Sequence, residues 1–249
     1  MPPITTLYLC RHGETDLNRK LVLQGRGVNA PLNEIGQKQA ELLGDWFKDV
    51  QVDVLCASTL LRAQQTAARI RKHHPDAEYK EYTGICELDF GEKEGLEFDE
   101  SLDVLLDQWN IQKDFDAKFE SGESPRDVEN RALPVIADIL KNLPKDTKQP
   151  RIAVVIHGRL LRILLSSLLW GNLHQMPAIS HCNTCVNEIH VYRADDPDLQ
   201  TIDITGYQQQ DPKYRANYPE SAQRKLLDGY CFVPVKLNSV EHLNGFEVL

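Results

Sequence analysis

Hydrophobic and polar positions along the chain follow two alternating patterns. Short apolar, β-branched runs predict strands, and most are followed by apolar residues at the three-to-four-residue spacing of an amphipathic helix. Predicted helices follow Asn33, the Ser58-Thr59 pair and Ser124, whose side-chain oxygens suit the N-cap position. A fourth predicted helix covers Leu160–Trp170. The predicted strands are Ile4–Cys10, Val50–Ala57, Tyr79–Leu88, Ile152–Ile156, Val186–Tyr192 and Phe232–Leu237.

This alternation of strands and helices predicts an α/β fold with a mainly parallel central sheet and helices on both faces. The continuous apolar run Ile152–Ile156 is typical of a central strand that is buried on both faces. In such sheets the active site lies beyond the carboxyl ends of the strands. The candidate catalytic and binding residues are therefore those that follow each strand.

Charged and polar side chains follow four of the predicted strands. Arg11 and His12 follow the first strand, Arg62 the second, Glu87 ends the third, and His157 follows Ile152–Ile156. Because the carboxyl ends of parallel strands meet at one edge of the sheet, we expect these five side chains to converge. An acidic stretch around Glu87 leaves open that this residue belongs to a solvated acidic face instead.

Two histidines and two arginines at one sheet edge suit a phosphoryl group. Guanidinium groups bind phosphate oxygens bidentately, and a neutral imidazole is a competent nucleophile, so His12 could accept the phosphoryl group. Arg11, Arg62 and a protonated His157 would stabilise the charge of the transition state. Glu87 would protonate the leaving oxygen and then deprotonate the attacking water. This chemistry requires no metal and no other cofactor, because cationic side chains take the place of the metal.

Composition narrows the classes of partner and location. The chain has 249 residues with 28 Lys+Arg against 37 Asp+Glu, and its net charge of −9 repels nucleic acid and anionic membranes. Its longest apolar stretch is shorter than the roughly 20 residues of a membrane span. The six cysteines are scattered, and the amino-terminal stretch carries no basic signal-peptide region, so we expect a cytoplasmic enzyme. A small phosphorylated substrate is the expected partner, and the pattern leaves the oligomeric state open.

Two other motifs do not support a dinucleotide or metal site. Gly25–Ala30 fits the dinucleotide-binding spacing G-x-G-x-x-A, but Pro31 favours an extended conformation where that motif needs a helix. Cys182-x-x-Cys185 has no second cysteine pair at metal-binding spacing.

Several segments together resemble the histidine phosphatase superfamily, in its phosphoglycerate mutase-like branch. They are Arg11-His12-Gly13-Glu14-Thr15 with Asn18, Pro31-Leu32-Asn33-Glu34-Ile35-Gly36, Ser58-Thr59-Leu60-Leu61-Arg62-Ala63, Glu87-Leu88-Asp89-Phe90-Gly91, Gly122-Glu123-Ser124 and His157-Gly158. The resemblance implies that His12 is phosphorylated, that Glu87 is the proton donor, and that Arg11, Arg62 and His157 bind phosphate. It also implies substrate contacts from Asn18, Gln24, Gly25 and Gly158.

The resemblance further implies one three-layer α/β domain over residues 1–249. It is silent at about 99–120 and at about 195–229. We expect a small helical cap insertion at about 96–123 and a variable excursion at about 195–229. The aromatic residues of the first segment could line a pocket or only pack the cap: Phe98, Trp109, Phe115 and Phe119.

Departures from the family pattern favour a phosphatase. Mutases of this family usually carry cations and a tyrosine after the catalytic acid, whereas this chain has Leu88, Asp89 and Phe90. We therefore expect a metal-independent phosphoric monoester hydrolase that acts on a small metabolite. Phosphoglycerate mutase-type transfer and a non-catalytic phospho-ligand-binding or scaffold domain remain alternatives. Arg159 stands where the family often has a small residue, which raises the hypothesis of a substrate with a second anionic group.

Overall fold

The computed structural model describes residues 2–195, 199, 208–209 and 227–246. Its helices are α1 (Asp16–Arg19), α2 (Glu34–Phe47), α3 (Leu61–Arg71), α4 (Glu100–Asp107), α5 (Pro125–Lys141) and α6 (Gly158–Trp170). Its strands are β1 (Thr5–Arg11), β2 (Val54–Ser58), β3 (Glu78–Tyr82), β4 (Arg151–Ile156), β5 (Val186–Arg193), β6 (Gln208–Gln209) and β7 (Tyr230–Ser239).

In the described part of the chain the strands form a single sheet with the order β3-β2-β4-β1-β5-β7-β6. The first four strands of this order are parallel to one another. Strand β5 pairs antiparallel with both β1 and β7, and β6 pairs parallel with β7, so β5 alone runs against the rest. The prediction of a mainly parallel sheet is confirmed.

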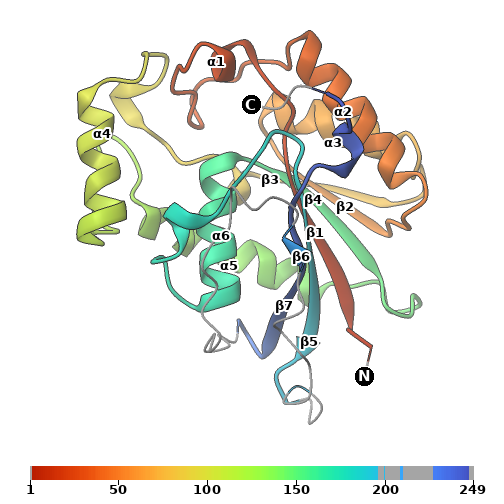
Figure 1. The fold of residues 1–249 in the computed structure, drawn as a ribbon. Coiled ribbons are helices and arrows are strands. Elements are labelled where there is room, and N and C mark those ends of the chain that lie inside the picture. Colours follow the sequence, from red (N-terminus) through yellow and green to blue (C-terminus); the bar gives the residue numbers. More distant parts are fainter. Residues whose placement is uncertain (1, 196–198, 200–207, 210–226, 247–249) are drawn as a thin grey trace.

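Each face of the sheet is covered by its own pair of helices (Figure 1). Side chains alternate along β1: Leu7 and Leu9 join the core under α5 and α6, while Tyr8 and Cys10 join the core under α2 and α3. Strand β4 contributes to both cores and is buried from Ile152 onward, as its uninterrupted apolar sequence predicts. The three-layer α/β architecture is therefore confirmed.

Two of the predicted helix starts have the expected caps. The Asn33 side chain accepts a hydrogen bond from the Gly36 amide at the start of α2. Ser124 and Asp127 form a reciprocal capping box at the start of α5, with Pro125 in the first turn. These caps fix where the chain leaves the loops that carry the site.

The start of α3 differs from the prediction. Helix α3 begins after Leu60 without a side-chain cap, so Ser58 and Thr59 are not its N-cap residues. Ser58 is instead the last residue of β2, and its hydroxyl contacts His157. The segment Val50–Ala57 also becomes a strand only at Val54, because the chain first turns at the end of α2 and its Val50 amide bonds back to Phe47.

The third predicted strand is shorter than expected. Strand β3 ends at Tyr82, and a 3₁₀ turn over Thr83–Ile85 then leads the chain to Glu87. Glu87 therefore lies on an irregular segment rather than at a strand end. This segment needs its own hydrogen bonds to hold its position.

The predicted cap segment contains α4 followed by a π-helical turn over Gln108–Gln112. Trp109 and Phe115 are buried in the main core, and Phe119 packs against it, whereas Phe98 is 52% exposed. Figure 1 shows α4 at the periphery of the molecule, away from the sheet. Most of the excursion at 195–229 lies outside the described residues, and the division of the chain into one domain stays a prediction.

Candidate active site

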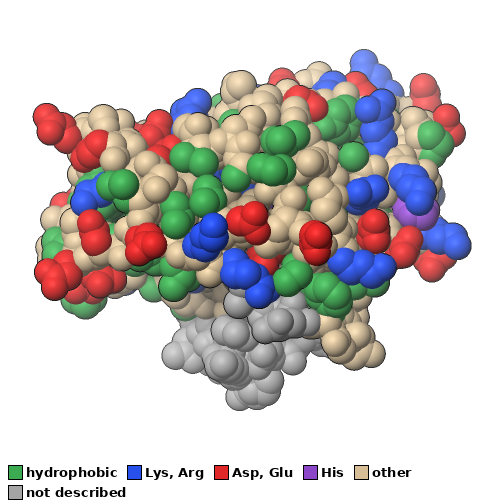
Figure 2. Space-filling view, turned by 90° about the horizontal axis from the view of Figure 1, so that it is seen from above, with side chains coloured by type: hydrophobic (Ala, Val, Ile, Leu, Met, Phe, Trp, Pro, Cys, Tyr) green, Lys and Arg blue, Asp and Glu red, His purple; other side chains and the backbone are tan. Residues whose placement is uncertain are grey.

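A cavity of about 120 Å³ opens where the parallel strands end. Seen from that end of the molecule, acidic and basic side chains are interspersed with hydrophobic ones (Figure 2). Of the nine site residues predicted from the sequence, all but His157 line this cavity: Arg11, His12, Asn18, Gln24, Gly25, Arg62, Glu87 and Gly158. His157 is fully buried next to His12, with a distance of 5.1 Å between the two ring centroids. The structure therefore brings all nine residues together.

His12 presents one defined nitrogen to the cavity. Its Nδ1 lies 2.6 Å from the carbonyl oxygen of Gly13. A carbonyl can only accept a hydrogen bond, so Nδ1 carries the proton and Nε2 retains its lone pair. Burial, followed by the charges of Arg62 and Arg11, holds the pKa of His12 well below its ordinary value. The imidazole is therefore neutral, which is the form that acts as a nucleophile.

Two arginines flank this imidazole and are held by backbone carbonyls. Arg11 donates to the carbonyl of His181 at 2.7 Å, and Arg62 donates to those of Gly25 and Val28 at 2.7 and 3.0 Å. Burial lowers the pKa of Arg62 to about 10, which still leaves a cation at neutral pH. Neutral acceptors orient these guanidinium groups without cancelling their charge.

His157 donates to or accepts from the Ser58 hydroxyl, with 2.7 Å between Nε2 and Oγ. Its Nδ1 is buried and has no hydrogen-bond partner in the described part of the chain. Burial and the charge of Arg62 hold the pKa of His157 well below its ordinary value. Burial and the nearby arginines therefore keep His157 neutral in the ligand-free protein, and its protonation in the transition state stays a prediction.

The carboxylate of Glu87 sits on the amino-terminal end of α6. Its oxygens accept hydrogen bonds from the backbone amides of Arg159 at 3.0 Å, and of Leu160 and Leu88 at 2.9 Å. These donors place a carboxylate at the positive end of the helix dipole and on the wall of the cavity. Glu87 is thus not part of a solvated acidic face.

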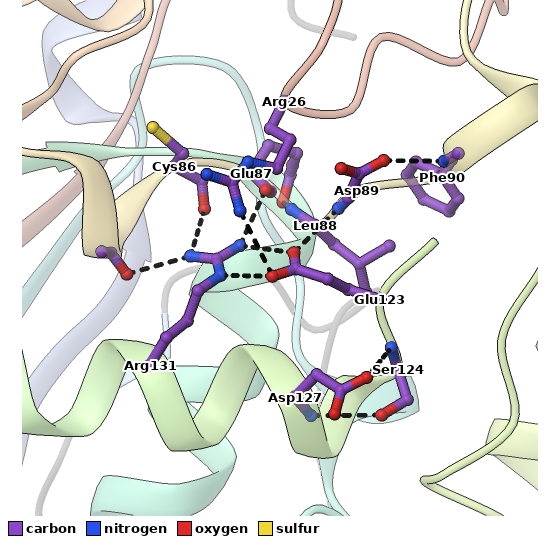
Figure 3. Close-up of polar contacts among 12 residues, drawn as sticks. Arg26, Cys86, Glu87, Leu88, Asp89, Phe90, Glu123, Ser124, Asp127 and Arg131 are labelled. Atoms are coloured by element: carbon purple, nitrogen blue, oxygen red, sulfur yellow. Dashed lines mark hydrogen bonds and ion pairs between the residues drawn. The ribbon is translucent and has the colours of Figure 1, made fainter. Parts of the chain in front are cut away.

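An arginine outside the cavity holds the backbone around Glu87 (Figure 3). Arg131 on α5 donates to the carbonyls of Gly84, Cys86 and Glu87 at 2.8–3.0 Å. Its guanidinium also makes two 2.8 Å bonds to the Glu123 carboxylate, which in turn accepts from the Asp89 amide. Sequence analysis matched Glu123 to a motif but assigned it no role, and it missed Arg131.

Two side-chain amides on the opposite wall are oriented by Thr15. The Thr15 amide donates to the side-chain oxygen of Asn18 at 3.1 Å, and its hydroxyl donates to that of Gln24 at 3.0 Å. With their oxygens so occupied, both side chains offer NH₂ groups to a ligand.

The loop that holds Arg62 is itself held by a carboxylate. Glu94 accepts hydrogen bonds from the amides of Arg26, Gly27, Val28 and Phe90 at 2.7–3.1 Å. Gly25 adopts a φ of +51°, and a Cβ there would overlap the Glu94 carboxylate, so this position requires glycine.

Other residues around the cavity have no site role assigned from the sequence. His181 and Phe90 line it, together with Phe98 and Arg159. Gly158 allows this packing, since a Cβ there would lie 3.0 Å from His181 and 3.2 Å from Arg11. The structure places on the cavity wall both Arg159, the hypothetical contact to a second anionic group, and Phe98, one of the aromatic residues that could line a pocket. No group of three or more potential metal-ligand side chains occurs among the described residues.

The fold and this site together define a class: α/β proteins that present a histidine between two arginines at the carboxyl edge of a parallel sheet. The chain belongs to the histidine phosphatase superfamily, branch 1, whose family model matches residues 7–205. Within the described residues, no helix is long and apolar enough to span a membrane.

Similarity to individual phosphatases supports this family membership. An uncharacterized phosphatase, PhoE of Bacillus subtilis (strain 168), is 28% identical over 188 residues, covering 75% of this chain and 88% of that protein. A 6-phosphofructo-2-kinase/fructose-2,6-bisphosphatase of Caenorhabditis elegans is 32% identical over 183 residues, or 70% of this chain, but the match spans only 36% of that relative. A solved mycobacterial glucosyl-3-phosphoglycerate phosphatase in complex with VO3 has a TM-score of 0.67 and 25% identity, covering 75% of this chain and 93% of that chain.

Proposed function

We propose that this protein is a metal-independent phosphatase that hydrolyses a phosphate monoester of a small metabolite through a phosphohistidine on His12. The orientation of His12 carries the proposal. Its Nδ1–H bonds to the Gly13 carbonyl, which leaves a neutral Nε2 in a cavity that Arg11 and Arg62 also line. The small volume of the cavity supports a small substrate.

Two half-reactions follow from this geometry. Nε2 of His12 attacks phosphorus, the bond from phosphorus to the ester oxygen breaks, and Glu87 gives its proton to the leaving oxygen. Water then attacks the phosphohistidine, Glu87 takes the proton of that water, and the phosphorus–nitrogen bond breaks to restore neutral His12. Arg11 and Arg62 stabilise the phosphoryl oxygens in both steps. The Nδ1 of His157, when protonated, supplies a further donor to them.

The segment after Glu87 supports hydrolysis over mutase-type transfer. Leu88 is fully buried, and the Asp89 carboxylate accepts from the Gly91 amide at 2.7 Å. Phe90 brings an aromatic surface to the cavity wall. This segment therefore offers the cavity none of the cations that mutases of the family usually carry after the acid.

The test is hydrolysis of 4-nitrophenyl phosphate with chelator present, followed by detection of phosphohistidine by mass spectrometry after a basic quench. The wild type is compared with His12→Ala and with His73→Ala, whose histidine pairs with Asp45 away from the cavity. We expect chelator-resistant turnover and a phosphorylated His12 in the wild type and in the His73 variant, and neither in His12→Ala.

Each other outcome overturns part of the proposal. Turnover that survives in His12→Ala refutes the nucleophile, and turnover lost with chelator refutes the metal-independent reaction. A folded wild type that binds phosphate but hydrolyses none of a panel of phosphate monoesters is a phospho-ligand-binding domain. Bisphosphate-activated isomerisation of phosphoglycerate identifies a mutase.

A further inference from the structure

The cavity collects more positive charge than a single phosphate monoester can neutralise. Besides Arg11 and Arg62, Arg159 of α6 lines the cavity. Arg162, three residues further along α6, does not line it but interacts electrostatically with Arg159, Arg11 and Glu87. Glu87 is the carboxylate whose charge acts on all four guanidinium groups. Four cations against one carboxylate leave an excess of three positive charges.

None of these four arginines forms an ion pair with a carboxylate of the described residues. Arginines elsewhere in the structure do so: Arg19 pairs with Glu14, and Arg131 with Glu123. Two other acids act on the cluster from farther away, but they are already bonded elsewhere. Glu14 binds Arg19 and Asn33, and Glu94 binds four backbone amides.

Arg159 and Arg162 are placed as a second group of cations. They are three residues apart on α6 and therefore lie on one face of that helix. The Arg159 guanidinium lies over the Trp109 ring, 5.5 Å from its centroid, and Trp109 is fixed by a 2.8 Å bond from its Nε1 to the Ala117 carbonyl. Stacking of this kind orients a guanidinium while leaving its N–H groups free to bind an anion.

Arg162 adds an unpartnered buried donor. Its Nε is buried and has no hydrogen-bond partner within the described residues. Burial, and then the charge of Arg159, lowers the pKa of Arg162 to about 9. A partly buried cation whose nearest charged neighbour is another cation is unfavourable unless an anion binds there.

We propose that the substrate carries a second anionic group, a carboxylate or a second phosphate, which Arg159 and Arg162 bind. A phosphate monoester brings close to two negative charges, which Arg11 and Arg62 match. The remaining positive charge lies on α6, and a second anion neutralises it. This inference rests on the proposed function for the placement of the reacting phosphoryl group at His12.

The test uses phosphonates, which resist hydrolysis, so that binding is measured without turnover. Isothermal titration calorimetry compares benzylphosphonate with its meta- and para-carboxy derivatives and with the corresponding meta- and para-xylylene diphosphonates. We expect at least one compound with a second anionic group to bind about tenfold more tightly than benzylphosphonate, or more. The carboxylate and phosphonate series show which second anion is preferred.

Variants localise the effect. In Arg159→Gln and Arg162→Gln we expect this affinity ratio to fall at least several-fold toward one. Arg69→Gln is the matched control, because Arg69 of α3 bonds to Gln37 of α2, neither residue lines the cavity, and the change should leave the ratio unchanged. The ratio separates an effect on the second anion from a general loss of positive charge.

Two results would overturn the proposal: equal affinities of the wild type for all these compounds, or a preference that persists in both variants. The wild-type comparison decides the matter even if a variant fails to fold. It is also separable from the proposed function, because a protein without phosphatase activity could still show the affinity ratio, and an active phosphatase could lack it.

Discussion

Replacing Arg131 by methionine tests how the segment that carries Glu87, the proposed proton donor, is held. Arg131 lies outside the cavity, yet its guanidinium binds the carbonyls of Gly84, Cys86 and Glu87 and forms a two-bond ion pair with Glu123. Methionine keeps much of the length and volume of the side chain but removes the five bonds. The change should therefore destabilise the protein and also loosen Glu87.

The structure sets the size of the stability effect. Removing one partner of a buried, hydrogen-bonded ion pair costs about 3–5 kcal/mol. The side chains of Arg131 and Glu123 remain 19% and 18% exposed, and Glu123 keeps its bond from the Asp89 amide, so the lower end of this range applies. We expect a loss of about 3 kcal/mol in the free energy of unfolding for Arg131→Met. Arg131→Lys should lose about 1.5 kcal/mol, since lysine keeps the charge but not the planar fork.

The effect on catalysis has a signature that a purely structural role would lack. A displacement of Glu87 by about 1 Å should lower kcat up to about 100-fold with little change in KM, because Arg131 does not contact the cavity. Phenyl phosphate needs protonation of its leaving oxygen more than 4-nitrophenyl phosphate does. The loss of kcat/KM should therefore be greater for phenyl phosphate, whereas mere loss of folded protein would lower both rates equally.

The assay combines urea unfolding, followed by tryptophan fluorescence, with the two kcat/KM values for the wild type, Arg131→Met and Arg131→Lys. A structural role of Arg131 is refuted if Arg131→Met has the same urea midpoint of unfolding as the wild type. A role in positioning Glu87 is refuted if the variant is destabilised but the ratio of the two kcat/KM values stays at the wild-type value.

Two further predictions concern the protonation and positioning of the phosphate-binding groups. Burial and the neighbouring arginines lower the pKa of His12 and His157, so neither should titrate near pH 6.5 in an NMR titration of histidine-labelled protein, and a midpoint there would contradict the assignment. Below about pH 6.5 both histidines take up protons in the unfolded chain but not in the folded protein. The contribution of His12 and His157 to the free energy of unfolding should therefore decrease as the pH falls. Glu94→Gln should weaken the loop whose carbonyls hold Arg62, raising KM for an aryl phosphate about threefold to tenfold, since a loss of about 1 kcal/mol or slightly more is typical of one such hydrogen bond. An unchanged KM in a folded Glu94→Gln variant would show that Arg62 keeps its place without this carboxylate.

The sequence predicts the parts of the site that depend on strand order and misses those that depend on tertiary contacts. His12 and His157 follow apolar strands, and parallel pairing of β1 with β4 brings them together as the pattern implied. The N-cap role expected for Ser58 is wrong because α3 begins only after Leu60, and the Ser58 hydroxyl instead bonds to His157, a residue 99 positions later. Arg131 and Glu123 could not be paired with the Glu87 segment from local pattern, since that contact depends on how α5 docks beside the 3₁₀ turn. Glu94 belongs to the acidic stretch around Glu87, and only the folded loop shows the four amides that it binds.

The arginines of the cavity are held differently from the arginines that pair with carboxylates. Outside the cavity, Arg19 and Arg131 are fixed by carboxylates, which cancel most of their charge. In the cavity, Arg11 and Arg62 are fixed by peptide carbonyls, and Arg159 by an indole ring, which orient the guanidinium groups but leave the charge in place. Orientation without neutralisation keeps the site complementary to an anion before the anion arrives, so little reorganisation is needed when it binds. The same arrangement is unfavourable in the empty protein, and a bound phosphate should therefore raise the free energy of unfolding by an amount set by its concentration relative to Kd.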